Sequence, residues 1–241
     1  MPHLDGDGGD GRPQPWLSCG VGEAIGSGKA PAFVMAYSRA SGDPCDTRAR
    51  ELLAGVWAAI APAAGPLPAQ SLRHGPGPRA GVVATGAAGL WWSSSVSYSA
   101  SGPVAAAAVF VQRLSPQTSR PRVTIGIDIE PVGRFVHAGV ARLVAARGVK
   151  EASLVAGGAV PLLAVVCVKE AVFKADPRQY GRVLADYAWI TATAAGDSGW
   201  CGVAMAGGDP RERFVVRVTR KQKNWLALAV AERGQLSALD R

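Results

Sequence analysis

The chain has 241 residues, 48% of them hydrophobic and only 18% charged, which is enough apolar material for a substantial core and excludes an intrinsically disordered protein. The formal net charge is +8, and most of the excess lies in residues 121–241, which hold seventeen of the 26 Lys and Arg but eleven of the 18 Asp and Glu. This half suits an acidic partner or a polyphosphate. It contains no basic stripe with interleaved aromatic residues, so we expect no nucleic acid partner.

The cysteines and the N-terminus indicate the compartment. The four cysteines show no C-x-x-C spacing, which argues against a zinc site and a disulfide framework. Aspartates stand near the N-terminus where a secretory signal would need positive charge, and the longest apolar run, residues 104–111, is too short to cross a bilayer. We therefore expect a soluble cytoplasmic protein that does not bind membranes.

The first half of the chain predicts a small α+β unit. Residues 1–30 are rich in Gly, Asp and Pro and show no periodicity, so we expect a flexible tail there. The elements predicted after this tail are, in order, a strand at 32–37, a helix at 46–61, a Pro- and Gly-rich loop at 62–78, a serine-rich segment at 94–99 and an apolar strand at 104–111.

Residues 123–130 predict a half-buried strand with an acidic face. Three isoleucines alternate with Gly126, Asp128 and Glu130, which is the two-residue period of a strand. The isoleucines are expected in a core, and the two carboxylates share the opposite face. Their β-carbons should lie roughly 6 to 7 Å apart, so their oxygens can converge on one hard cation. Gly126, on the same face, is expected to leave room for a ligand.

A helix is predicted over residues 162–175, where a long apolar run ends in good helix formers. Glu170 and Lys174 are four residues apart and share one helical face, which offers a third carboxylate and a cation for a phosphate. Two simpler interpretations stay open. The two residues can form an ordinary surface pair worth about 0.2 to 0.5 kcal/mol, and Asp128 and Glu130 can be the solvated face of a strand.

The two segments together resemble the 4'-phosphopantetheinyl transferases. Residues 126–130 match that family's Gly-Ile/Val-Asp-Ile/Val-Glu strand, and residues 169–174 match its Lys-Glu-Ala/Ser-x-x-Lys helix. The resemblance implies that Asp128, Glu130 and Glu170 hold Mg²⁺ against the pyrophosphate of coenzyme A. Lys174 would contact this phosphate, and Glu170 or a metal-bound water would take the proton from the attacking serine.

The resemblance also implies coenzyme A contacts in the first half. Arg48 stands where the family often has an arginine near the nucleotide, although a solvated helix arginine fits equally well. Arg73 or Arg79, at the ends of a loop that resembles the family's Gly-x-Pro loop, could meet the adenine nucleotide. Ser97 matches a Ser-aliphatic-Ser-His motif, but Tyr98 replaces the histidine expected at the 3'-phosphate. A tyrosine can donate one hydrogen bond but carries no positive charge at neutral pH, so we expect weaker or altered coenzyme A recognition.

After the helix, the pattern predicts strands at 187–193 and 202–206 and a hairpin pairing 214–219 with 225–231. The expected class is therefore α+β. The resemblance implies a pseudo-dimer of two similar lobes, residues 31–120 and 121–233, with the metal at their junction and a tail at 234–241. A chain that holds both lobes is expected to be a monomer.

The implied function is that of a holo-acyl-carrier-protein synthase. Such an enzyme transfers phosphopantetheine from coenzyme A to a serine of an acyl or peptidyl carrier protein, an acidic helical bundle, and releases 3',5'-ADP. Polyketide or non-ribosomal peptide synthesis is the expected context. Because of Tyr98, a second possibility stays open: a degenerate family member that binds coenzyme A or a carrier protein without turnover. A magnesium-dependent nuclease is less favoured, because Pro131 and Val132 follow Glu130 where an Asp/Glu-x-Lys motif would place lysine.

Overall fold

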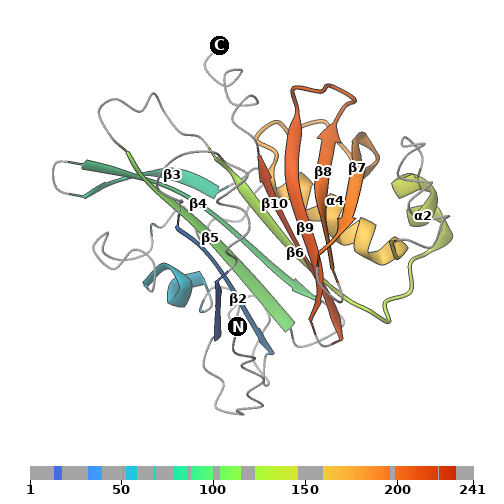
Figure 1. The fold of residues 1–241 in the computed structure, drawn as a ribbon, viewed down its shortest axis with the longest axis horizontal. Helices are drawn as coiled ribbons and strands as arrows, with labels where there is room; N and C mark the ends of the chain where they lie inside the picture. The colour runs from blue at the N-terminus through green and yellow to red at the C-terminus, as the bar shows by residue number, and fades with distance from the viewer. Residues whose placement is uncertain are drawn as a thin grey trace.

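The computed structural model describes residues 14–17, 32–39, 51, 53–58, 68, 79–85, 88–99, 104–114, 123–145, 160–195, 199–221 and 223–231. Over these residues the chain combines helices with two five-stranded antiparallel sheets, so the predicted α+β class is confirmed. The first sheet has the order β1-β2-β5-β4-β3 and the second the order β6-β10-β9-β8-β7 (Figure 1).

The strands range from four residues in β1 to twelve in β4. The first sheet contains β1 (Gln14–Leu17), β2 (Ala32–Arg39), β3 (Arg79–Thr85), β4 (Ala88–Ser99) and β5 (Val104–Leu114). The second contains β6 (Ile125–Pro131), β7 (Tyr187–Ala194), β8 (Gly199–Ala206), β9 (Arg213–Lys221) and β10 (Asn224–Ala231). The helices are α2 (Ala138–Ala145), α4 (Leu162–Ala175) and the short 3-10 helix η3 (Leu184–Asp186), and residues 53–58 are also helical.

Most of the predicted elements are present. The predicted strands correspond to β2, β5, β6, β7 and β8, and β9 pairs with β10 as the predicted hairpin. The helix predicted over residues 162–175 is α4, with the same bounds. The loop predicted over residues 62–78 lies outside the described residues except for Pro68.

Two regions differ from the prediction. Residues 14–17, expected within a flexible tail, form β1 and pair antiparallel with β2. The strands β3 and β4 were not predicted, because their sequences, rich in Ala, Gly and Ser, lack a clear two-residue period. These two strands pair with each other, and β4 also pairs with β5, so β4 is an interior strand of the first sheet.

One face of the second sheet is covered by α4. The helix is buried over most of its length, as its apolar run from Leu162 to Val168 predicts. Its buried side chains share a core with Tyr187, Trp189, Phe214 and Trp225 of the sheet.

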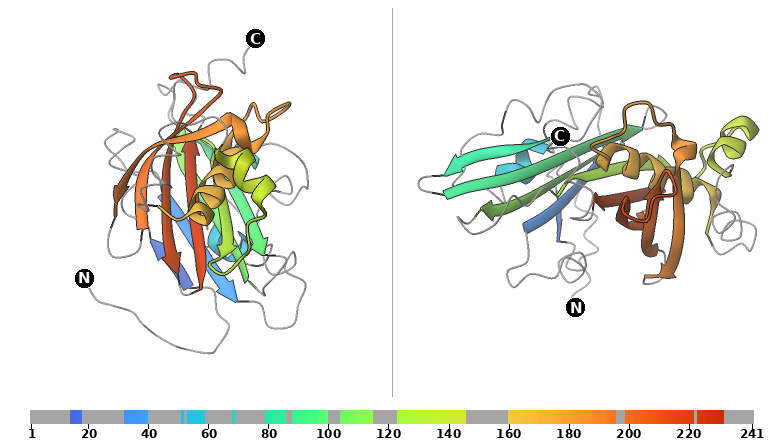
Figure 2. Two further views of the ribbon diagram at one scale, coloured as in Figure 1. Left: turned by 90° about the vertical axis from the view of Figure 1, so that its right-hand side faces the viewer. Right: turned by 90° about the horizontal axis from the view of Figure 1, so that it is seen from above.

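Among the described helices, none has both the length and the apolar sequence needed to cross a membrane. In Figures 1 and 2, α2 lies at the end of the molecule away from the first sheet.

The other face of β6 and β10 packs against the first sheet. Ile125, Ile127 and Ile129 form a second core here with Ala106 and Ala108 of β5. The three isoleucines are at most 2% exposed, so the prediction that they point into a core is confirmed. Because β10 is covered on both faces, all of its residues are buried, which explains its nearly continuous apolar sequence.

The contact between the sheets runs along the free edge of β6. Alternate residues of β4 face this edge, and we call Ser93, Ser95 and Ser97 the serine row. The backbone N–H of Ile125 donates to Ser93 Oγ at 3.1 Å, and that of Ile127 donates to Ser95 Oγ at 3.0 Å. These hydroxyls replace the backbone carbonyls of a neighbouring strand, so β6 does not leave these amides unpaired.

A buried ionic network fixes the C-terminal end of α4. The carboxylate of Asp176, which is 1% exposed, accepts hydrogen bonds from Arg182 at 2.7 Å and from the Tyr187 hydroxyl at 2.8 Å. Arg178 pairs with Glu212 at 2.7 Å, and Arg182 reaches the same glutamate. Burial and the negative charge of Asp176 raise the pKa of Tyr187, which therefore stays protonated as a donor. The network ties the helix end to β7 and to the turn before β9.

Gly126 sets the distance between β6 and α4. A β-carbon at this position would lie 1.9 Å from the carbonyl oxygen of Ala171 and 2.6 Å from the nitrogen of Ala175, both backbone atoms of α4. The expectation that Gly126 leaves room for a ligand was therefore wrong, because the helix backbone occupies that space. Nearby, the Thr124 hydroxyl donates to the Ala175 carbonyl at 2.6 Å and fixes the same contact.

We expect Gly126→Ala to lower the free energy of unfolding by roughly 1 to 3 kcal/mol or more, because helix and strand must move apart. Urea denaturation measures this change. The matched control is Gly133→Ala, where a β-carbon would meet nothing within 4 Å; its effect should stay within about 0.5 kcal/mol. Equal stability of the two variants would contradict the close packing.

Candidate metal centre

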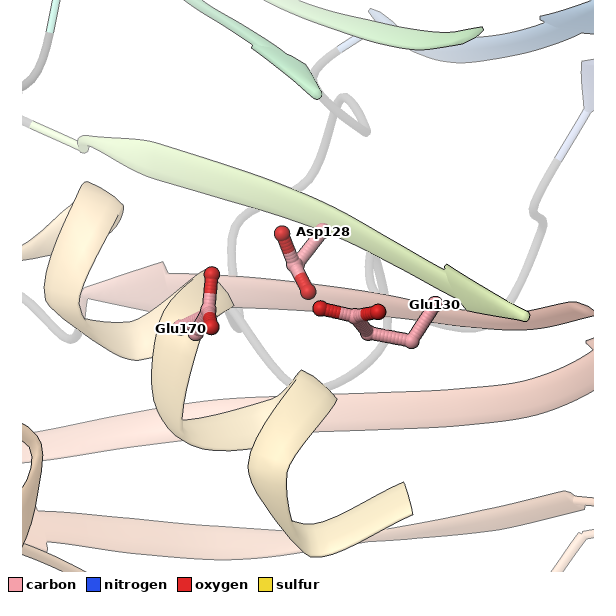
Figure 3. Close-up of side chains that lie close together, drawn as sticks. All are labelled: Asp128, Glu130 and Glu170. Atoms are coloured by element: carbon pink, nitrogen blue, oxygen red, sulfur yellow. The ribbon is translucent and has the colours of Figure 1, made fainter. Parts of the chain in front are cut away.

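Three carboxylates meet between β6 and α4. Asp128 and Glu130 lie on β6 and Glu170 on α4, and one oxygen of each lies within 4.8 Å of the others. Figure 3 shows the three side chains pointing toward one another across the gap between strand and helix. Asp128 and Glu130 are 2% and 5% exposed. The structure thus brings together the three residues that the sequence pattern suggested. Asp128 and Glu130 are buried and do not form a solvated strand face.

The position of Glu170 follows from the packing at Gly126. Because α4 touches the strand through the backbone of Ala171, the preceding residue is held close to the acidic face of β6. Gly126, Asp128 and Glu130 alternate along the strand, so the contact and the two carboxylates share one face. The interpretation of Glu170 and Lys174 as an ordinary surface pair does not describe this site.

The two oxygens of Asp128 have different surroundings. Oδ1 accepts a hydrogen bond from the Ser97 hydroxyl at 2.8 Å and an ion pair from Lys174 at 2.7 Å. Oδ2 is buried and has no hydrogen-bond partner. A buried, unpaired carboxylate oxygen costs free energy, and a hard cation is the ligand that carboxylates of this kind bind. The residues present therefore fit a Mg²⁺ ion.

Lys174 contacts three acceptors of the protein itself. Its ammonium donates to Asp128 Oδ1 at 2.7 Å, to Ser97 Oγ at 3.0 Å and to the Ile127 carbonyl at 3.2 Å. A lysine has three donors, so all of them are used in this state. We expected Lys174 to contact a phosphate; the structure shows it holding Asp128.

A second cation, Arg134, was not predicted. Its guanidinium pairs with Glu130 Oε1 from a position four residues further along the chain. The side chain is 48% exposed, so it reaches the site from the solvent side. A basic residue just beyond an acidic strand is the only sequence signal that could have indicated this pair.

The site retains uncompensated negative charge. Burial, followed by the charge of Asp128, raises the pKa of Glu170 to about 7, although Lys174 opposes this shift. Burial also raises the pKa of Glu130, against the hydrogen bond from Arg134. A carboxylate with a pKa near neutrality can accept a proton during a reaction at that pH. A divalent cation would compensate the negative charge of these buried carboxylates and so lower the pKa of both Glu170 and Glu130.

The residues expected to bind coenzyme A are described only in part. Ser97 lies in the site, bonded to Asp128 and Lys174. Tyr98 and Arg79 belong to β4 and β3, but their side chains lie outside the described part of the structure. Arg48 and Arg73 lie outside the described residues. Their roles stay predictions.

No protein-family model matches the chain, and a search of curated proteins found no match.

The raised pKa of Glu170 predicts a pH-dependent stability. Between pH 4.5, the ordinary pKa of a glutamate, and about pH 7, Glu170 is protonated in the folded protein but ionised in the unfolded chain. The free energy of unfolding should therefore fall as the pH rises through this range. The loss attributable to Glu170 is on the order of 2 to 3 kcal/mol. Urea denaturation of metal-free protein between about pH 5 and pH 8 measures it, and Mg²⁺ should restore stability at the upper end.

The variant Glu170→Gln should reduce the dependence of the free energy of unfolding on pH. The dependence that remains should come from Glu130, whose pKa is also raised. The matched control is Asp209→Asn, which changes an exposed residue in the turn between β8 and β9 and should leave the slope unchanged. A wild-type slope in Glu170→Gln would show that Glu170 ionises normally.

Proposed function

We propose that this chain is a Mg²⁺-dependent 4'-phosphopantetheinyl transferase, a holo-acyl-carrier-protein synthase. One observation carries the proposal. The strand motif of residues 126–130 and the helix motif of residues 169–174 bring three carboxylates together, with one oxygen of each within 4.8 Å of the others, and one of them, Asp128, has a buried oxygen without a hydrogen-bond partner. The motifs supply the family resemblance, and the geometry supports metal binding by the same residues.

The two-sheet arrangement is compatible with the two-lobed pseudo-dimeric class of this family. Each sheet has five antiparallel strands, and the carboxylates lie on β6, the strand of the second sheet that contacts the first. We propose a monomer on this basis, with coenzyme A bound where the two sheets meet. The proposed cytoplasmic location rests on the cysteine spacing and the acidic N-terminal sequence.

In the proposed reaction, a serine hydroxyl of the carrier protein attacks the β-phosphorus of coenzyme A. The new serine oxygen–phosphorus bond forms as the bond from this phosphorus to the bridging oxygen breaks, and 3',5'-ADP leaves with that oxygen. Asp128, Glu130 and Glu170 would hold Mg²⁺, which supplies charge neutralisation for the pyrophosphate. Glu170, or a water held by the ion, would accept the serine proton.

The cations of the site have distinct proposed roles. Lys174 holds Asp128 in place, and it would have to exchange one of its acceptors to reach a phosphate. Arg134 forms an ion pair with Glu130, and about half of its side chain is exposed to solvent. It can therefore turn toward an anionic substrate. The excess of basic residues in the second half would favour encounter with an acidic carrier protein.

A non-catalytic binder of coenzyme A is the second candidate. Two observations favour it: Tyr98 replaces the expected histidine, and the three donors of Lys174 are all used within the protein. This candidate predicts binding without turnover.

Intact-protein mass spectrometry tests the proposal. Apo carrier proteins from fatty-acid, polyketide and peptide synthesis are incubated with the chain, coenzyme A and Mg²⁺. We expect a mass gain of one phosphopantetheine that disappears on chelation, because the pyrophosphate charge is then no longer neutralised. Asp128→Asn and Glu170→Gln should lower the rate at least about 100-fold, whereas Asp209→Asn should not change it.

The other outcomes discriminate between the candidates. Coenzyme A binding without a mass gain on any carrier would support the non-catalytic binder. Absence of both binding and transfer would overturn the assignment to this family.

A further inference from the structure

The serine row offers one hydroxyl that differs from the other two. Ser93 and Ser95 accept hydrogen bonds from the backbone of β6, whereas Ser97 donates to the side chain of Asp128 at 2.8 Å. Ser97 Oγ also accepts a hydrogen bond from Lys174 at 3.0 Å. The row therefore ends on a proposed metal ligand and on the cation that pairs with it.

These two bonds determine which Asp128 oxygen is free. Both Ser97 and Lys174 bond Oδ1, so the carboxylate cannot rotate without losing two charge-assisted contacts. Oδ2 stays buried and unpartnered within the acidic cluster. Asp128 is thus held ready to bind a cation through one oxygen only.

We infer that Ser97 is a positioning residue for the metal site, through which the first sheet sets the metal affinity of carboxylates that all lie on β6 and α4. The inference rests on the proposed metal function. Partners that orient a metal ligand typically change metal affinity by about 10- to 100-fold when they are removed. Ser97 is 5% exposed, and its hydroxyl proton is already used by Asp128. This role therefore differs from the direct coenzyme A contact that the family resemblance implies for Ser97.

Titration calorimetry with MgCl₂ tests the inference without any substrate. We expect Ser97→Ala to raise the Kd for Mg²⁺ about tenfold or more, and Ser97→Thr, which keeps the hydroxyl, to stay close to wild type. In the transfer assay the defect should appear in the magnesium concentration required, and saturating magnesium should restore the rate.

Two neighbouring serines are matched controls. Ser95→Ala removes the acceptor of the Ile127 N–H, so its melting temperature should fall while its Kd for Mg²⁺ stays unchanged. Ser94 is buried, but its hydroxyl has no partner, so Ser94→Ala should change neither quantity. If Ser97→Ala does not fold, Ser97→Cys replaces it, because a thiol is a weak donor and should also weaken Mg²⁺ binding.

The possible results separate this inference from the function on which it rests. Wild-type Mg²⁺ affinity in Ser97→Ala, or in Ser97→Cys if that variant replaces it, would overturn the positioning role and leave the metal site intact. A change in coenzyme A affinity alone would identify Ser97 as a substrate contact instead. If the wild-type chain itself binds no Mg²⁺, both the metal site and this inference are wrong.

Discussion

The close contact between β6 and α4 is the constraint on which the site depends. Only a glycine at position 126 allows the backbone of α4 to approach the strand so closely. The approach holds Glu170 beside the carboxylates of β6, and Thr124 and the network around Asp176 keep the helix end in place. The position of Glu170 is thus determined by a residue that has no side chain of its own.

Burial of β6 on both faces explains the electrostatics. The strand lies between α4 and the first sheet, so Asp128 and Glu130 have little access to water. Lys174 and Arg134 compensate part of this charge, yet the pKa of Glu170 remains raised and one oxygen of Asp128 remains unpaired. A protein that required only stability would be better served by apolar residues here. The proposed cation site would account for this arrangement.

Sequence patterns predicted the parts of the fold that depend on local periodicity. Alternation in residues 123–130 indicated both faces of β6, and the apolar run followed by good helix formers indicated α4. The same patterns placed Asp128, Glu130 and Glu170 on elements that could meet.

The remaining features depend on contacts between distant segments, which no local pattern encodes. The serines of β4 resemble a solvated strand face, but they lie against the edge of β6 about thirty residues away in sequence. The partners of Lys174 come from both sheets, so its role follows only from their packing. Gly126 fits a ligand-facing glycine and a helix-facing one equally well until the position of α4 is known.

The proposed divalent cation site of Asp128, Glu130 and Glu170 can be examined in a crystal of the chain grown with Mn²⁺, a substitute for Mg²⁺ that scatters anomalously. We expect an anomalous peak at bonding distance from Asp128 Oδ2 and from oxygens of Glu130 and Glu170, with Lys174 still paired with Oδ1. Saturating Mn²⁺ without a peak there, or a peak bound only by other residues, would show that the three carboxylates do not form this site.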